Sequence, residues 1–132
     1  MNNLRRLSFA FGLVAMTLAG AMPVRANEMV GVFQTVDGAQ DYEVTYCGNG
    51  KQLCGKLIAL HGAGDTEDNR RYIGKYIVEN LNPAGTNVWK GLLTINNNSA
   101  NGTATLIPGK ELILKGCAYI ILCAEFRMKQ IR

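Results

Sequence analysis

The chain of 132 residues carries 14 lysines and arginines against 10 acidic residues, a formal net charge of +4. Three of the arginines, Arg5, Arg6 and Arg25, lie before residue 27. Residues 27–132 keep seven lysines and four arginines against ten acids, so their net charge is only +1. This near balance argues against a protein that binds nucleic acid or an acidic surface through its charge.

The N-terminal segment has the three parts of a secretory signal peptide. Arg5 and Arg6 supply a positive start, residues 7–20 form an apolar run, and residues 24–26 (V-R-A) fit the cleavage signal. The apolar run is too short and wrongly flanked for a transmembrane helix. We therefore expect residues 1–26 to be a signal peptide. Residues 27–132 are expected to form a single domain that is periplasmic or secreted, without a transmembrane segment.

Short apolar segments with a period of two residues follow at regular intervals. Strands are expected at residues 30–35, 41–47, 53–60, 88–95, 103–107, 112–114 and 118–128, and residues 72–78 suit a strand or a short helix. The polar or glycine-rich segments 61–71, 80–86 and 96–102 are expected to be loops, and Gly116 to separate the last two strands. About eight short strands without a sustained helical period predict an all-β sandwich or closed barrel.

The last predicted strand has a long alternation of apolar residues. Its apolar face is Ala118, Ile120, Leu122, Ala124, Phe126 and Met128. On the strand 88–95 the corresponding face is Trp89, Gly91, Leu93 and Ile95. On both faces small residues stand next to large ones, which predicts either close packing or a pocket.

Four cysteines, Cys47, Cys54, Cys117 and Cys123, follow the expected signal peptide. An even number in a small exported domain predicts two disulfides, with three possible connectivities. Loop-closure entropy gives roughly 4 kcal/mol for a long-range bridge against roughly 2 to 2.5 for a local one, which favours a crossed pairing. The short turn-like segment within each neighbouring pair instead favours Cys47–Cys54 and Cys117–Cys123, which is our prediction. A zinc site would need closer spacing.

Four stretches, in this order, carry a resemblance to a known family. They are residues 47–55 (C-G-N-G-K-Q-L-C-G), 89–91 (W-K-G), 101–102 (N-G) and 112–123 (L-I-L-K-G-C-A-Y-I-I-L-C). Together they resemble the small exported bacterial proteins of the domain of unknown function 2147 family. The resemblance implies a lipocalin-like, antiparallel up-and-down barrel of about eight strands, with no established activity. The chain departs from the family at Phe33, in place of the tryptophan of an early Gly-x-Trp motif. It departs again at Met128 and Gln130, in place of a late Trp-x-Arg.

Candidate catalytic and metal-binding residues form no complete set. His61 and the G-A-G that follows it are similar to the oxyanion loop of esterases, but the nucleophile elbow is absent, and Ser99 is the only serine after residue 26. Asp65, Glu67 and Asp68 cluster in one loop but lack the calcium-loop pattern. We therefore expect a protein that is not an enzyme, with no metal and no cofactor, and with His61 on a surface loop.

Large amphipathic side chains favour a binding role instead. Such side chains, with an apolar ring and a polar tip, suit the mouth of a pocket. They are Trp89, Tyr42, Tyr46, Tyr72 and Tyr76. Arg70 and Arg71 beside Tyr72 suit a carboxylate or phosphate head group. The plainer interpretation is that Trp89 belongs to the core and that the arginines lie in a solvated turn.

Two functions remain open at this point. The leading hypothesis is a barrel that binds a small apolar or amphipathic ligand, with Trp89, Gly91, Tyr42, Tyr46 and Phe126 at the site. The alternative is a periplasmic protein-interaction module, an inhibitor or envelope assembly factor. An open apolar cavity would favour the first, and a filled interior with an exposed apolar patch the second.

Overall fold

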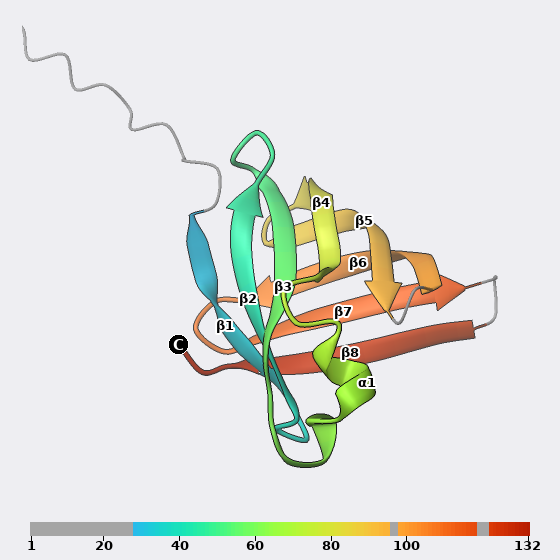
Figure 1. Cartoon of the computed structure of the whole chain (residues 1–132). Coiled ribbons are helices and arrows are strands. Elements are labelled where there is room, and N and C mark those ends of the chain that lie inside the picture. Colours follow the sequence, from blue (N-terminus) through green and yellow to red (C-terminus); the bar gives the residue numbers. More distant parts are fainter. Residues whose placement is uncertain (1–27, 96–97, 119–121) are drawn as a thin grey trace, which may run out of the picture.

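The computed structural model describes residues 28–95, 98–118 and 122–132, so the expected signal peptide lies outside the described part of the chain. Antiparallel strands follow one another around a closed barrel, in the order in which they occur in the sequence (Figure 1). The strands are β1 (Met29–Thr35), β2 (Gln40–Cys47), β3 (Gln52–Leu60), β4 (Tyr76–Gly85), β5 (Val88–Ile95), β6 (Asn98–Ile107), β7 (Glu111–Ala118) and β8 (Leu122–Gln130). The all-β, up-and-down barrel predicted from the sequence is confirmed.

The barrel closes where β1 pairs with β8. Phe33 lies opposite Gln130 in this short ladder. Phe33 is fully buried and Met128 nearly so, so both fill the core at the closure. Gly31 lets the C-terminus approach closely, because a Cβ atom there would lie 2.9 Å from the carbonyl oxygen of Arg132.

Side chains from all eight strands meet in one apolar core. Its members are Phe33, Tyr42, Val44, Leu53, Leu57, Val78, Leu81, Trp89, Leu93, Ala104, Leu106, Leu112, Leu114 and Met128. A barrel of this strand number is just wide enough for side chains to fill it, and here they fill much of its length.

Two of the predicted loops are wrong, because their residues belong to strands. β4 continues through Pro83 to Gly85, and β6 begins at Asn98, inside the expected asparagine-rich turn. Proline is tolerated in β4 because the pairing with β3 ends at Leu81, while Pro83 itself pairs with Trp89 of β5. Because Pro83 lies beyond Leu81, its missing N–H group removes no hydrogen bond to β3.

The expected break at Gly116 is also wrong. β7 runs through Gly116 to Ala118, so Ala118 belongs to β7 and not to the strand expected at 118–128, while β8 runs from Leu122 to Gln130. Gly116 lies opposite Gly102 of β6, and a side chain on either glycine would meet Leu93. The two glycines make room for a large core residue. The side chains of Ile95, Ala118, Ile120 and Leu122, which the sequence places on inner faces, lie outside the described part.

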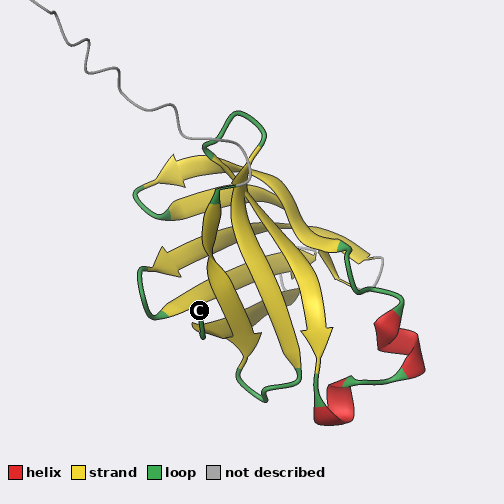
Figure 2. Ribbon diagram, turned by 60° about the vertical axis from the view of Figure 1, so that its left-hand side comes forward, coloured by secondary structure: helices red, strands yellow, loops and turns green. Residues whose placement is uncertain are grey.

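The segment between β3 and β4, residues 61–75, is called the connector below. It contains two short helices, η1 (Gly62–Gly64) and α1 (Glu67–Arg70), where the sequence predicts a loop. Figure 2 shows both helices outside the strands, at the end of the barrel where β3 ends. We call this end, where β1 turns into β2 and β3 passes into the connector, the mouth of the barrel.

Candidate ligand-binding site

A cavity of about 280 Å³ lies at the mouth and is called the mouth pocket. Five strands and the connector supply its walls. The lining residues are Gln40, Tyr42, Leu57, Asn69, Tyr72, Lys75, Tyr76, Ile77, Thr94 and Phe126. Aromatic and aliphatic side chains outnumber polar ones, as is typical of small-molecule sites, and the volume lies just below their usual range of roughly 300–1,000 Å³.

Tyr42 provides a buried wall of the mouth pocket. Its side chain is only 7% exposed, and its hydroxyl donates a hydrogen bond to Gln40 Oε1 at 2.7 Å. Burial raises the pKa of Tyr42 to about 12, so the hydroxyl remains a neutral donor even at a pH where an ordinary tyrosine ionises. No group within the described residues accepts a hydrogen bond from the side-chain amide of Gln40. That amide is therefore available to a ligand.

The connector is fixed to the barrel at both ends, so the wall that it forms is held in place. Near its start Gly64 packs on the turn between β1 and β2, where a Cβ atom would lie 2.7 Å from the Cβ of Ala39. At its end the backbone N–H of Gly74 donates to the carbonyl of Leu57 at 2.7 Å, and the N–H of Leu57 donates to the carbonyl of Lys75 at 3.0 Å. Gly74 has a φ of +86°, a conformation that favours glycine.

Positive charge gathers around Tyr72 at the rim of the mouth pocket. Lys75 Nζ lies 5.6 Å from the centre of the Tyr72 ring, and Arg71 Cζ lies 5.2 Å from it. Both distances are within the range of cation–π contacts. Among the ion pairs of the described residues, none involves Lys75 or Arg71. Lys75 is also the only charged residue of the described chain that lines the pocket.

The two neighbouring arginines that suggested a head-group site have different partners in the structure. Arg70 Nε donates to Asp65 Oδ1 at 2.7 Å within the connector, and this hydrogen bond holds the pKa of Asp65 below its ordinary value. Arg71 alone remains beside Tyr72, where Lys75 joins it. Sequence reasoning did not select Lys75. The available signal was that Lys75 and the preceding Gly74 interrupt an otherwise apolar segment.

His61 pairs with a buried carboxylate, which the sequence did not indicate. His61 Nε2 lies 2.8 Å from Asp41 Oδ2, and Gln34 Nε2 donates to Asp41 Oδ1 at 2.9 Å. Asp41 is 5% exposed, and no other charged residue of the described part is buried. Burial raises the pKa of Asp41, but the hydrogen bonds from His61 and Gln34 and the nearby positive charges outweigh it and keep that pKa below its ordinary value.

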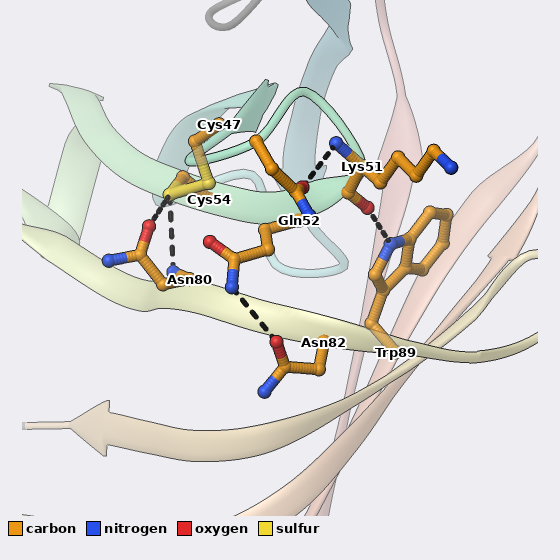
Figure 3. The surroundings of a disulfide bond; sticks show 8 residues. Cys47, Lys51, Gln52, Cys54, Asn80, Asn82 and Trp89 are labelled. Atoms are coloured by element: carbon orange, nitrogen blue, oxygen red, sulfur yellow. Dashed lines mark hydrogen bonds between the residues drawn. A yellow bond between two sulfur atoms is a disulfide. The ribbon is translucent and has the colours of Figure 1, made fainter.

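Trp89 and Tyr46 lie at the other end of the barrel, with ring centroids 6.4 Å apart. Trp89 is 6% exposed, and its indole N–H donates to the carbonyl of Lys51 at 3.0 Å, beside the Cys47–Cys54 disulfide (Figure 3). A hollow of about 350 Å³ lies next to the two rings. Because the core already uses both the ring and the N–H group of Trp89, this residue offers a ligand little surface.

Gly91 does not open a space beside Trp89. A Cβ atom on Gly91 would lie 2.8 Å from Leu81 Cδ2, so here the alternation of large and small residues is close packing. The five residues predicted for the ligand site are thus divided. Tyr42 and Phe126 line the mouth pocket, Trp89 and Tyr46 lie at the opposite end, and Gly91 accommodates Leu81.

Both predicted disulfides are present. Cys47–Cys54 joins β2 to β3, and Cys117–Cys123 joins β7 to β8. No cysteine of the described chain is free. Figure 3 shows Asn80 of β4 against the first bridge, where its backbone N–H donates to Cys54 Sγ at 3.3 Å. The first bridge thus contacts a third strand.

No protein-family model, curated protein or solved structure matches this chain. Within the described residues, no three histidine, cysteine, aspartate or glutamate side chains are arranged to hold a metal ion. None of the helices described here is long and apolar enough to cross a membrane.

Proposed function

We propose that the chain is an exported, non-enzymatic β-barrel that binds a small amphipathic ligand in the mouth pocket. The observation that carries this proposal is the cavity of about 280 Å³ with largely aromatic and aliphatic walls. Its few polar groups suit a site that orients one end of a ligand and buries the other.

Export is the second part of the proposal, and the two disulfides support it. Such bonds persist in oxidising compartments outside the cytoplasm. The arrangement of positive, apolar and small residues in positions 1–26 supports a signal peptide that is removed. Membership of the domain of unknown function 2147 family remains a proposal that rests on the stretches quoted above. The intact mass of the exported protein tests the predicted cleavage site, since the mass of a chain that begins at Asn27 is expected.

Binding is tested by titrating a neutral apolar probe, 1-octanol, into the purified protein and following backbone amide resonances by NMR. We expect shifts at the mouth pocket, for example at Tyr76 and Ile77, and not at Trp89. Replacement Phe126→Ala removes one apolar wall and should weaken binding about tenfold, because burial of a large apolar side chain contributes roughly 1.5–3 kcal/mol.

The matched control is Leu92→Ala. Leu92 is 52% exposed and Phe126 is 43% exposed, but Leu92 does not line the mouth pocket. The control should therefore bind as the unaltered protein does. If 1-octanol moves no mouth resonance at high concentration, and organic extraction of the native protein yields no small molecule, the ligand-binding proposal fails. The protein-interaction module would then be the better hypothesis.

A further inference from the structure

We infer that the ligand of the mouth pocket is an anionic amphiphile, whose head group is recognised by Lys75 while its short apolar tail lies against the aromatic wall. This inference rests on the proposed function, because it names the chemical class of the ligand for the same pocket. It commits to a free small anion such as a medium-chain carboxylate.

The charge of the residues that line the pocket favours an anionic ligand. Among the described residues, Lys75 is the only charged one that lines the cavity, and none of their carboxylates forms an ion pair with it or with Arg71. Of the three acidic residues of the connector, Asp65 is paired with Arg70, while Glu67 and Asp68 lie in the first turn of α1 and are not among the residues that line the cavity. A ligand inside the cavity therefore has the ammonium group of Lys75 as its charged neighbour, which an anion complements and a cation does not.

The position of Lys75 is fixed by its surroundings. Its carbonyl accepts a hydrogen bond from the N–H of Leu57, and its own N–H donates to the carbonyl of Tyr72. Its ammonium group lies 5.6 Å from the centre of the Tyr72 ring. Because the backbone is held on β3 and the side chain rests on a ring, Lys75 loses less freedom when it binds an anion than an unsupported surface lysine would.

The apolar wall and a second polar group complete the match to an amphiphile. Leu57, Ile77 and Phe126 provide apolar surface for a tail. The amide of Gln40, whose oxygen accepts from Tyr42, supplies N–H donors suited to a carboxylate oxygen. A cavity of about 280 Å³ limits the ligand to a short tail.

Isothermal titration calorimetry with octanoate, 1-octanol and octylammonium, in the full exported chain, tests the inference. The three probes share one tail and differ in the charge of the head group. We expect octanoate to bind about fivefold more tightly than 1-octanol, since an exposed charge pair contributes up to roughly 1 kcal/mol, and octylammonium to bind most weakly. The preference for octanoate should decrease as salt is added.

Two variants assign the effect to Lys75. Lys75→Met should remove the preference for octanoate over 1-octanol, and Lys75→Arg should retain it. The control Lys110→Met removes the same charge in the turn between β6 and β7, at the opposite end of the barrel, and should leave the preference unchanged. Thermal unfolding of each variant checks that the fold is intact.

If octanoate and 1-octanol bind equally, or if Lys75→Met keeps the preference, the anionic head group is wrong while the proposed pocket stands. If neither probe binds, the proposed function fails and the inference fails with it. Binding to vesicles of phosphatidylglycerol without binding to octanoate would also overturn the inference, because it would point to a membrane surface as the partner.

Discussion

His61 Nε2 lies 2.8 Å from Asp41 Oδ2, and this contact fastens the first residue of the connector to β2. The backbone supports the same junction, since the N–H of His61 donates to the carbonyl of Ala39 at 2.8 Å. The second carboxylate oxygen of Asp41 accepts from Gln34 of β1. One buried carboxylate therefore joins β1, β2 and the connector at the mouth.

Asp41→Asn should destabilise the protein at neutral pH by roughly 1–3 kcal/mol, the cost of breaking a buried hydrogen-bonded group. The pKa of Asp41 is lowered in the folded protein, so the ionised carboxylate stabilises the fold. That stabilisation is complete above the ordinary aspartate pKa of about 4 and is lost as the pH falls through the lower, folded value. Urea unfolding at pH 7 and at about pH 2 measures the difference.

The free energy of unfolding of Asp41→Asn should thus be closer to that of the unaltered protein in acid than at neutral pH. His61→Gln is the companion variant, since it keeps a side-chain hydrogen-bond donor and removes the imidazole ring. Equal stability of Asp41→Asn and the unaltered protein at pH 7 would show that the carboxylate contributes nothing to the junction.

Tyr42 should ionise later than an ordinary tyrosine. Burial raises its pKa to about 12, so the neutral phenol stabilises the fold below the ordinary pKa of about 10, and this contribution is lost as the pH rises through the folded value. Ultraviolet titration of tyrosinate absorbance, compared between the unaltered protein and Tyr42→Phe, isolates the signal of this residue. A Tyr42-dependent transition near pH 10 in the folded protein would contradict the buried wall of the mouth pocket.

The strands could be predicted from the sequence because their evidence is local, whereas the choice of a barrel over a sandwich rested on the resemblance. Alternation of apolar residues marks a strand within a few residues, and the close spacing of Cys47 with Cys54 favours a hairpin bridge. Gly102 and Gly116 were misread because a glycine in a turn and a glycine that admits a neighbour look alike in sequence. Only the register, which brings both glycines to Leu93, separates the two cases.

The mouth pocket could be predicted only in part. Tyr42 and Phe126 were selected because large side chains on an inner face suit a cavity. In the connector Tyr72 was also selected, with Arg70 and Arg71 as a head-group site. The remaining connector residues were not, since their polar sequence is typical of a solvated loop and the contacts of the connector with β3 depend on backbone hydrogen bonds of Leu57. The fold brings Lys75 and the Asp41–His61 pair to the mouth. Local sequence patterns do not predict contacts between residues that are so far apart in the chain.

Removal of the Cys47–Cys54 bridge should destabilise the protein by about 2 kcal/mol, as expected for closing a short loop. The bridge joins β2 to β3 and contacts the backbone of Asn80. The double variant Cys47→Ala with Cys54→Ala avoids a free thiol, and denaturant unfolding measures the change. The corresponding double variant at Cys117 and Cys123 is the comparison for a bridge at the mouth end. An unchanged midpoint in the first variant would mean that pairing of β2 with β3 is secured without the bridge.

Gly91→Ala should destabilise the barrel by about 1–2 kcal/mol, because overpacking a filled core costs roughly 1–3 kcal/mol and the gain from replacing glycine offsets part of it. A Cβ atom there would lie 2.8 Å from Leu81 Cδ2, and Leu81 is fully buried. A double-mutant cycle with Leu81→Ala, measured by urea unfolding, identifies the cause. Leu81→Ala alone should cost roughly 2–5 kcal/mol, and in its presence Gly91→Ala should cost much less, since the obstructing methyl group is gone. Additive effects would instead show that the cost of Gly91→Ala does not come from its contact with Leu81.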